Sequence, residues 1–376
     1  MRASENGVKV RDSSVPPAAR LRATTERDRR FDRLRVLAAI LVVGAHAGSF
    51  VINRAPAWSG AWWPATATVT MPRSAVPLFV MISGALLLRD MGHSSPQPME
   101  ARPIIASIRR RIGKIGWPLL FWSIVYLTLQ IWTGAGDPRV TSGGVGGMID
   151  AILLGKPMYH MYYLFITAGL YLATPFLRIL VRGLAPTGVR LLAAGALLLA
   201  SLSSLVDWRL GTEDANALSL FVSFIGYFLL GHSLVDARPV PRRGLWISAA
   251  VVASLGSWCA YLLAVAAGSA SAITYLESFL DPLTVLAAVA VFAVATDRQQ
   301  APTTTQDGPA TRLSGLTFGI YLVHPVFVAA IGTLLPQPEK MPGGLSVLAG
   351  LWISALVAAS LFVMVAKRVP VLRHVV

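Results

Sequence analysis

Two histidines lie inside long apolar stretches, where an ionisable side chain is rare and is commonly functional. His46 belongs to the apolar run that begins near residue 35, and His324 lies ten residues into a later run that begins near residue 314. A neutral imidazole can accept a proton from an attacking hydroxyl group. Both residues are therefore candidate catalytic groups. The alternative for each is a buried histidine that only bonds a neighbouring helix.

Arg35 precedes His46 with ten residues between them. In an α-helix a step of eleven residues turns about 20° past three full turns and advances about 16 Å, so both side chains should project from nearly the same face. Such a spacing suits an extended ligand with an anionic end and a reactive end, because arginine binds phosphate with two parallel hydrogen bonds. The alternative for Arg35 is an ordinary basic residue at the inner end of a helix.

A dense cationic cluster precedes the Trp117-Pro118 pair. Its members are Arg109, Arg110, Arg111 and Lys114. We take Arg110, Arg111 and Lys114 as candidate ligands for phosphate groups, and the alternative is anchoring at the membrane surface.

Two hydroxyl side chains are candidates for positioning a substrate. Tyr321 lies one helical turn before His324 and so shares its face. Pro325 follows His324 and can kink the helix at that depth. Ser83 lies in the stretch 77–84, whose small residues would let helices approach closely.

Other polar residues near the apolar segments receive simpler interpretations. We expect His160, which has tyrosines on both sides, to lie in an interfacial belt. His232 is also expected at an interface. Glu277 and Asp281 are interpreted as a hydrated helix end, although they could bind the hydroxyls of an acceptor.

The composition shows what must position these residues. Of 376 residues, 55% are hydrophobic and only 14% are charged, and the mean hydropathy is +0.61. Soluble chains carry about 25% charged residues, so this is an all-α, polytopic transmembrane bundle. One cysteine, Cys259, excludes an internal disulfide framework, a cysteine-based zinc site and an iron–sulfur cluster. No metal site is expected.

About ten segments are long enough to cross a bilayer, which takes about 20 residues. They are 35–53, 70–88, 115–134, 161–181, 189–206, 217–235, 244–267, 275–296, 314–335 and 344–366.

The basic residues alternate across these ten spans. The side that carries both termini holds 27 of the 33 Lys and Arg residues, and the other side holds six: Arg54, Arg73, Arg139, Lys156, Arg209 and Lys340. This bias predicts cytoplasmic termini by the positive-inside rule. The net charge of +15 therefore needs no nucleic-acid partner. We expect a disordered basic tail over 1–32, a ten-helix membrane domain over 33–368 and a cytoplasmic tail over 369–376.

Together, these motifs resemble the acyltransferase-3 family of integral-membrane acyltransferases. The Arg35 and His46 pair is similar to the family's Arg-x10-His signature, and the stretch 79–84 to its phenylalanine-rich Ser-Gly segment. The basic start of the third span and the segments 162–175 and 318–325 are also similar to family patterns. Arg111 and Lys114 stand where the family often has Arg-x-x-Arg, and lysine keeps the charge but lacks the fork geometry.

The resemblance implies an O-acyltransferase that moves an acyl group, often acetyl, from cytoplasmic acyl-CoA to a hydroxyl. The acceptor would be a cell-surface glycan, a lipid-linked sugar or a secreted small molecule. Acyl-CoA would be a co-substrate, with no permanently bound cofactor. The lipid bilayer and envelope-biosynthesis proteins are the expected partners, and the plasma or inner membrane the expected location. Two alternatives stay open: a transporter or flippase for a glycolipid or small molecule, and a structural subunit of an envelope assembly.

Overall fold

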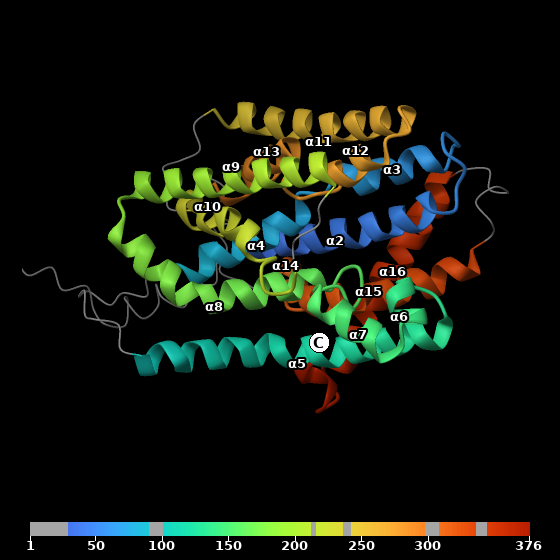
Figure 1. Ribbon diagram of the computed structural model, residues 1–376, viewed down its shortest axis with the longest axis horizontal. Helices are drawn as coiled ribbons and strands as arrows, with labels where there is room; N and C mark the ends of the chain where they lie inside the picture. The colour runs from blue at the N-terminus through green and yellow to red at the C-terminus, as the bar shows by residue number, and fades with distance from the viewer. Residues whose placement is uncertain (1–28, 90–100, 212–215, 236–241, 298–307, 336–343) are drawn as a thin grey trace, which may run out of the picture.

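The protein is a bundle of helices in a computed structural model that describes residues 29–89, 101–211, 216–235, 242–297, 308–335 and 344–376 (Figure 1). No strand occurs among these residues. The long helices are α2 (Arg29–Ile52), α5 (Ala101–Thr133), α8 (Tyr162–Gly183), α9 (Pro186–Leu210), α11 (Arg243–Ala266), α15 (Thr317–Leu334) and α16 (Gly344–Ala366). The shorter ones are α3 (Trp62–Thr70), α4 (Ala75–Leu87), α6 (Pro138–Ser142), α7 (Gly144–Leu153), α10 (Ile225–Val235), α12 (Ala270–Leu276), α13 (Pro282–Thr296) and α14 (Pro309–Ser314).

Within the described residues, eight helical segments are long and apolar enough to cross a membrane, with α3 and α4 together forming one of them. The expected spans 217–235 and 275–296 correspond to shorter apolar helices, Val222–Val235 and Pro282–Thr296. Helix α13 starts late because the Asp281 carboxylate caps its first turn and Pro282 occupies its first position. The structure thus confirms a polytopic all-α bundle, with two spans shorter than expected.

The second span is a broken helix, where the sequence led us to expect one helix over 70–88. Helix α3 ends at Thr70 and α4 begins at Ala75, and the turn between them contains Pro72 and Arg73. A proline removes a backbone donor and interrupts a helix. Arg73, counted on the outer side at the start of this expected span, therefore lies between two helical halves of one membrane segment.

Helices α4 and α10 pack with almost no space between their backbones. A Cβ atom on Gly84 would lie 1.8 Å from the Phe228 carbonyl oxygen, and one on Gly231 would lie 1.9 Å from the Met81 carbonyl oxygen. Only glycine permits this approach. This confirms the prediction that small residues of the second span let helices come close.

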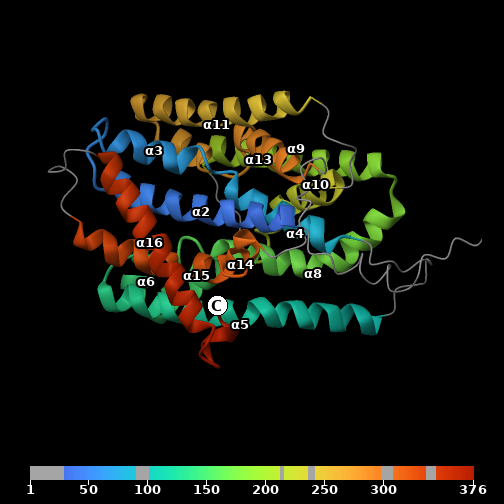
Figure 2. The same cartoon turned by 180° about the vertical axis from the view of Figure 1, so that it is seen from behind.

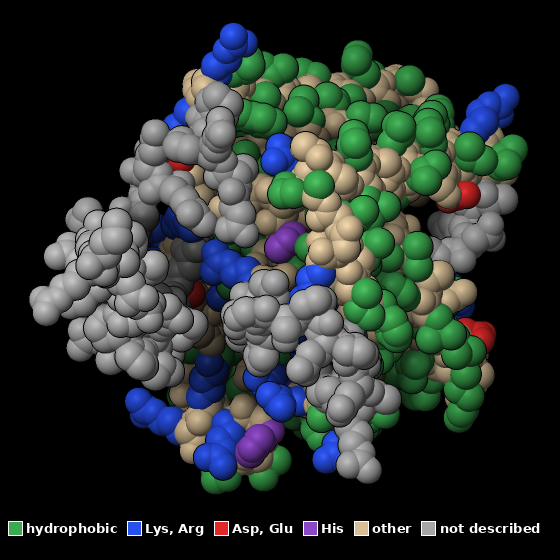
Figure 3. Space-filling model, turned by 90° about the vertical axis from the view of Figure 1, so that its left-hand side faces the viewer, with side chains coloured by type: hydrophobic (Ala, Val, Ile, Leu, Met, Phe, Trp, Pro, Cys, Tyr) green, Lys and Arg blue, Asp and Glu red, His purple; other side chains and the backbone are tan. Residues whose placement is uncertain are grey.

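The helices run between two ends of the bundle. One end holds the starts of α5 and α9 and the ends of α8 and α10, on the left of Figure 1. Lys and Arg side chains gather on this face in the space-filling view (Figure 3), so we call it the basic end. Seen from behind, α16 crosses the bundle obliquely (Figure 2). The C-terminal turn packs on α5, where the Trp122 indole donates to the Val375 carbonyl at 2.8 Å.

Candidate active site

The bundle brings the two candidate catalytic histidines into contact. His46 on α2 and His324 on α15 have ring centroids 5.0 Å apart. The two helices pack directly against each other. The prediction that both histidines reach the same depth is therefore confirmed by their contact.

The orientation of the His324 ring is set by the proline that follows it. Pro325 has no N–H, so it cannot donate to the carbonyl of Tyr321 one turn earlier. The Nδ1 atom of His324 lies 2.8 Å from that carbonyl oxygen and 3.2 Å from the Ile320 carbonyl oxygen. Carbonyl oxygens only accept hydrogen bonds, so Nδ1 carries a hydrogen and donates. In the neutral ring the lone pair is then on Nε2, which is buried and makes no hydrogen bond within the described residues.

A third histidine, His160, belongs to the same cluster. It lies in the turn before α8 and is 1% exposed, with its ring centroid 5.5 Å from that of His324. The expectation that it sits in an interfacial belt is wrong, because its ring is buried against the rings of Tyr126 and Tyr321. Tyr159 contacts His46, with ring centroids 4.9 Å apart. No helical periodicity marks Tyr159 and His160, since both lie in a turn.

Tyr321 takes part in this cluster through its hydroxyl. That hydroxyl donates to the backbone carbonyl of His160. Its O–H is therefore already used to hold the turn before α8 against α15. Tyr321 is thus placed to position the site and not to donate to a reaction intermediate.

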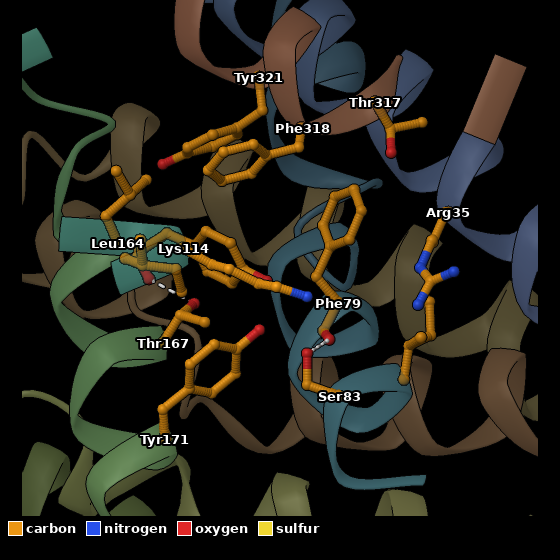
Figure 4. A pocket seen from close by; sticks show the side chains of 13 residues that line it. Arg35, Phe79, Ser83, Lys114, Leu164, Thr167, Tyr171, Thr317, Phe318 and Tyr321 are labelled. Atoms are coloured by element: carbon orange, nitrogen blue, oxygen red, sulfur yellow. Dashed lines mark hydrogen bonds between the residues drawn. The ribbon is translucent and has the colours of Figure 1, made fainter. Parts of the chain in front are cut away.

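A cavity of about 270 Å³ opens between this cluster and the basic end (Figure 4). Four of the predicted site residues line it, namely Arg35, Ser83, Lys114 and Tyr321. The Lys114 ammonium reaches into the cavity from one side, and the Arg35 guanidinium lies on the other. Ser83 donates to the Phe79 carbonyl at 2.9 Å, so its oxygen can still accept a hydrogen bond.

Arg35 is held in place by a buried acid one helical turn earlier. Its Nη1 lies 3.5 Å from the Asp32 carboxylate, and the Asp32 side chain is 1% exposed while that of Arg35 is 31% exposed. The Ser314 hydroxyl donates to the same carboxylate oxygen at 2.7 Å. This arrangement orients a partly exposed guanidinium at the rim of the cavity.

The predicted cationic cluster divides between two surfaces of α5. Lys114 lines the cavity. The Arg111 guanidinium lies 5.9 Å from the ring centroid of Tyr171, which also lines it, and its buried Nη1 makes no hydrogen bond within the described residues. Arg110 is exposed and lines a separate surface groove with Arg109. The structure therefore brings Lys114 and Arg111, and not Arg110, to the site.

A larger cavity, of about 960 Å³, lies on the other side of the histidine cluster. His46 lines it, together with Tyr159, Arg73 and Glu277. Arg73 and Glu277 form an ion pair with an Nη2–Oε1 distance of 3.2 Å. Glu277 is therefore more than a hydrated helix end, whereas Asp281 is 1% exposed and caps α13 through the Leu283 and Thr284 amides at 3.1 Å each.

Arg35 and His46 thus line different cavities, although we expected one continuous face. Tyr163 and Tyr321, whose ring centroids are 5.3 Å apart, line the cavity at the basic end. Tyr162 and Pro325 line the larger one. Helix geometry predicted that Arg35 and His46 lie on one face of α2. It could not predict that aromatic rings from α8 and α15 would divide the space beside that face into two cavities.

The arrangement offers the His46 imidazole on the wall of the wide cavity, while the narrow, basic cavity is lined by Tyr321, one helical turn from His324. Among the described residues, no group of three or more His, Cys, Asp and Glu side chains could hold a metal ion.

A family model described as an acyltransferase domain, of the acyltransferase-3 type, matches residues 28–368. No curated protein and no solved structure matches the chain.

Proposed function

The chain belongs to the acyltransferase-3 family of membrane acyltransferases, and from that premise we propose that it moves an acyl group, in the first instance acetyl, from acyl-CoA to a hydroxyl of a cell-surface glycan, lipid-linked sugar or similar acceptor. The observation that carries the proposal is the contact of His46, which lines the wide cavity, with His324, which is one helical turn from Tyr321 on the wall of the basic cavity. The transporter and the structural subunit that the sequence left open receive no support from the family match.

The smaller cavity supports a donor site at the basic end. Arg35, Lys114 and Arg111 would bind the phosphates of acyl-CoA, because a cationic N–H group makes strong hydrogen bonds to a phosphate oxygen. A volume of about 270 Å³ is at the low end for a small-molecule site, so it would take the thioester arm and leave the nucleotide outside. Asp32 would serve by orienting Arg35.

His46 would be the general base, because it lines the larger cavity while His324 lies behind it. The acceptor oxygen attacks the thioester carbonyl and its proton passes to His46. As the C–S bond breaks and the ester C–O bond forms, that proton passes on to the departing thiolate of CoA. His324 would hold the His46 ring by direct ring contact, with the two centroids 5.0 Å apart.

The charge bias supports a cytoplasmic basic end, and hence a cytoplasmic donor and an acceptor approaching from the outer side of the plasma or inner membrane. In a Cys259→Ser background, an impermeant maleimide applied to intact cells should label Arg139→Cys and not His374→Cys. Both native side chains are exposed. The reverse labelling pattern would overturn the orientation.

The test of the function has two parts. The purified protein should release CoA thiol from acetyl-CoA only when a hydroxyl acceptor is added. Mass spectrometry of glycans and lipids from cells with and without the protein should then identify the acylated molecule. A protein that consumes no acyl-CoA with any acceptor, and whose loss removes no acyl group from either fraction, would contradict the proposal.

A further inference from the structure

The larger cavity beside His46 has a charge that its position in the bundle does not explain. Basic residues are rare on the side of the spans that lies opposite the basic end. That side holds only six of the 33 Lys and Arg residues. Three of those six, Arg54, Arg73 and Lys156, line this one cavity. The lining contains one carboxylate, that of Glu277. Topology disfavours cations on this side, so their concentration in one cavity indicates a local role.

Arg73 is the most deeply placed of the three cations. It lies at the break between α3 and α4, and its side chain is only 12% exposed. It donates to the Glu277 backbone carbonyl as well as pairing with the Glu277 carboxylate, while its buried Nε makes no hydrogen bond within the described residues. The Glu277 side chain is 46% exposed, so solvent weakens the pair. Arg73 therefore presents to the cavity a cation whose ion pair with Glu277 is partly open to solvent, so an anionic ligand could share it.

Arg54 and Lys156 add charge at the rim of the same cavity. Both side chains are exposed. The Arg54 guanidinium lies 3.5 Å from the centroid of the Phe50 ring and donates to the Phe50 carbonyl at 3.2 Å. These contacts hold the guanidinium beside a ring that also lines the cavity.

Most of the remaining lining is apolar or aromatic, including Phe50, Tyr159, Tyr162 and Phe279. The Tyr162 and Phe279 rings stack with centroids 5.7 Å apart. A cavity of about 960 Å³ with such walls is large enough for a sugar and part of a hydrocarbon chain. The lining therefore suits a molecule with an apolar part as well as an anionic group.

We propose that this cavity binds an amphipathic acceptor that carries a phosphate or a carboxylate near the hydroxyl to be acylated, with Arg73 as the principal anion ligand. This inference rests on the proposed function for the role of the bound molecule as an acceptor. Arg73 holds the anionic group, Arg54 and Lys156 attract it, and the aromatic walls hold the apolar part. The hydroxyl then lies at His46, which lines the same cavity.

The test uses three probes with the same dodecyl chain: dodecyl β-glucoside, dodecyl β-glucuronide and dodecyl glucosyl phosphate. Binding of each to the purified full-length protein is measured by titration, and acetyl transfer is measured with acetyl-CoA. We expect at least one anionic probe to bind about tenfold or more tightly than the neutral probe. The two anionic probes distinguish a carboxylate-bearing from a phosphate-bearing acceptor.

Arg73→Gln should weaken binding of the preferred anionic probe about tenfold to a hundredfold and leave the neutral probe nearly unchanged, as expected for the loss of a charge-assisted hydrogen bond. The matched control is Arg139→Gln, because Arg139 lies on the same side, is exposed and does not line the cavity. Arg54→Gln and Lys156→Gln, at exposed positions, should each lower the preference a few-fold, which keeps the test valid if Arg73→Gln does not fold.

The two proposals fail in different ways. Transfer to acceptors without any preference for the anionic probes, or a preference that survives all three cavity substitutions, would overturn the anionic subsite and leave the acyltransferase intact. Charge-selective binding that depends on Arg73 without transfer to any probe would support the subsite and contradict the proposed role as an acceptor site.

Discussion

The Nδ1 atom of His324 donates to the carbonyl of Tyr321 because Pro325 leaves that carbonyl without its helical partner. This single relationship fixes the ring whose centroid lies 5.0 Å from that of His46. It also leaves the lone pair of neutral His324 on Nε2. The sequence Val323-His324-Pro325 thus explains how the buried His324 ring is held in one orientation against the His46 ring.

Arg35→Lys should raise the KM for acetyl-CoA about tenfold with little change in kcat or in the amount of folded protein. Lysine keeps the charge at the cavity rim but loses the two-pronged geometry that Asp32 orients. The measurement is steady-state kinetics at saturating acceptor. Arg33→Lys is the control, because Arg33 is exposed on the same helix and does not line the cavity. Equal kinetics for the two variants would remove Arg35 from the donor site.

The sequence predicted much of this fold because its apolar runs recur in a regular pattern. Hydropathy predicted the eight spans found among the described residues, and helix rise predicted that His46 and His324 lie at one level. Arg73 and His160 were missed for a common reason. Both lie in turns, Arg73 between α3 and α4 and His160 before α8. Helical periodicity cannot predict which side chains of a turn are buried. Their positions depend on which distant helices pack around them.

Lys114→Gln and Arg110→Gln should have unequal effects, although both remove one charge from successive turns of α5. The Lys114 ammonium reaches into the cavity, and we expect its loss to raise the KM for acetyl-CoA about tenfold. Arg110 lies on an exposed groove where solvent screens its charge, so its loss should change KM by no more than about twofold. Kinetics at two ionic strengths would check this. A larger effect from Arg110 would shift the donor site to the surface groove.

Pro325→Ala should lower kcat several-fold while the protein still folds. The alanine restores an N–H that competes with His324 for the Tyr321 carbonyl, so the imidazole loses its fixed orientation. His324→Ala should also reduce activity, with part of the loss arising from misfolding because this side chain is fully buried. Activity is measured per folded protein. Full activity of both variants would exclude a positioning role for His324.

Gly84→Ala should destabilise the bundle, because the added Cβ would lie 1.8 Å from the Phe228 carbonyl oxygen. Overpacking of this kind costs about 1–3 kcal/mol and occasionally more. Gly195→Ala is the matched control, since a Cβ there meets no atom within 4 Å and alanine favours a helix. Thermal unfolding in detergent should show a lower Tm only for Gly84→Ala. Equal Tm values would mean that α4 and α10 are less closely packed.

The central claim is that the His46 imidazole is the base that receives the acceptor proton. The most direct measurement is acceptor acylation by His46→Ala, normalised to folded protein, with His374→Ala, at an exposed position outside both cavities, as the control. A catalytic base contributes about 10²–10⁴-fold to the rate, so His46→Ala should fall to near background while His374→Ala stays at the wild-type level. Retention of more than about a tenth of the activity by His46→Ala would contradict the account, since that loss is smaller than a missing base produces.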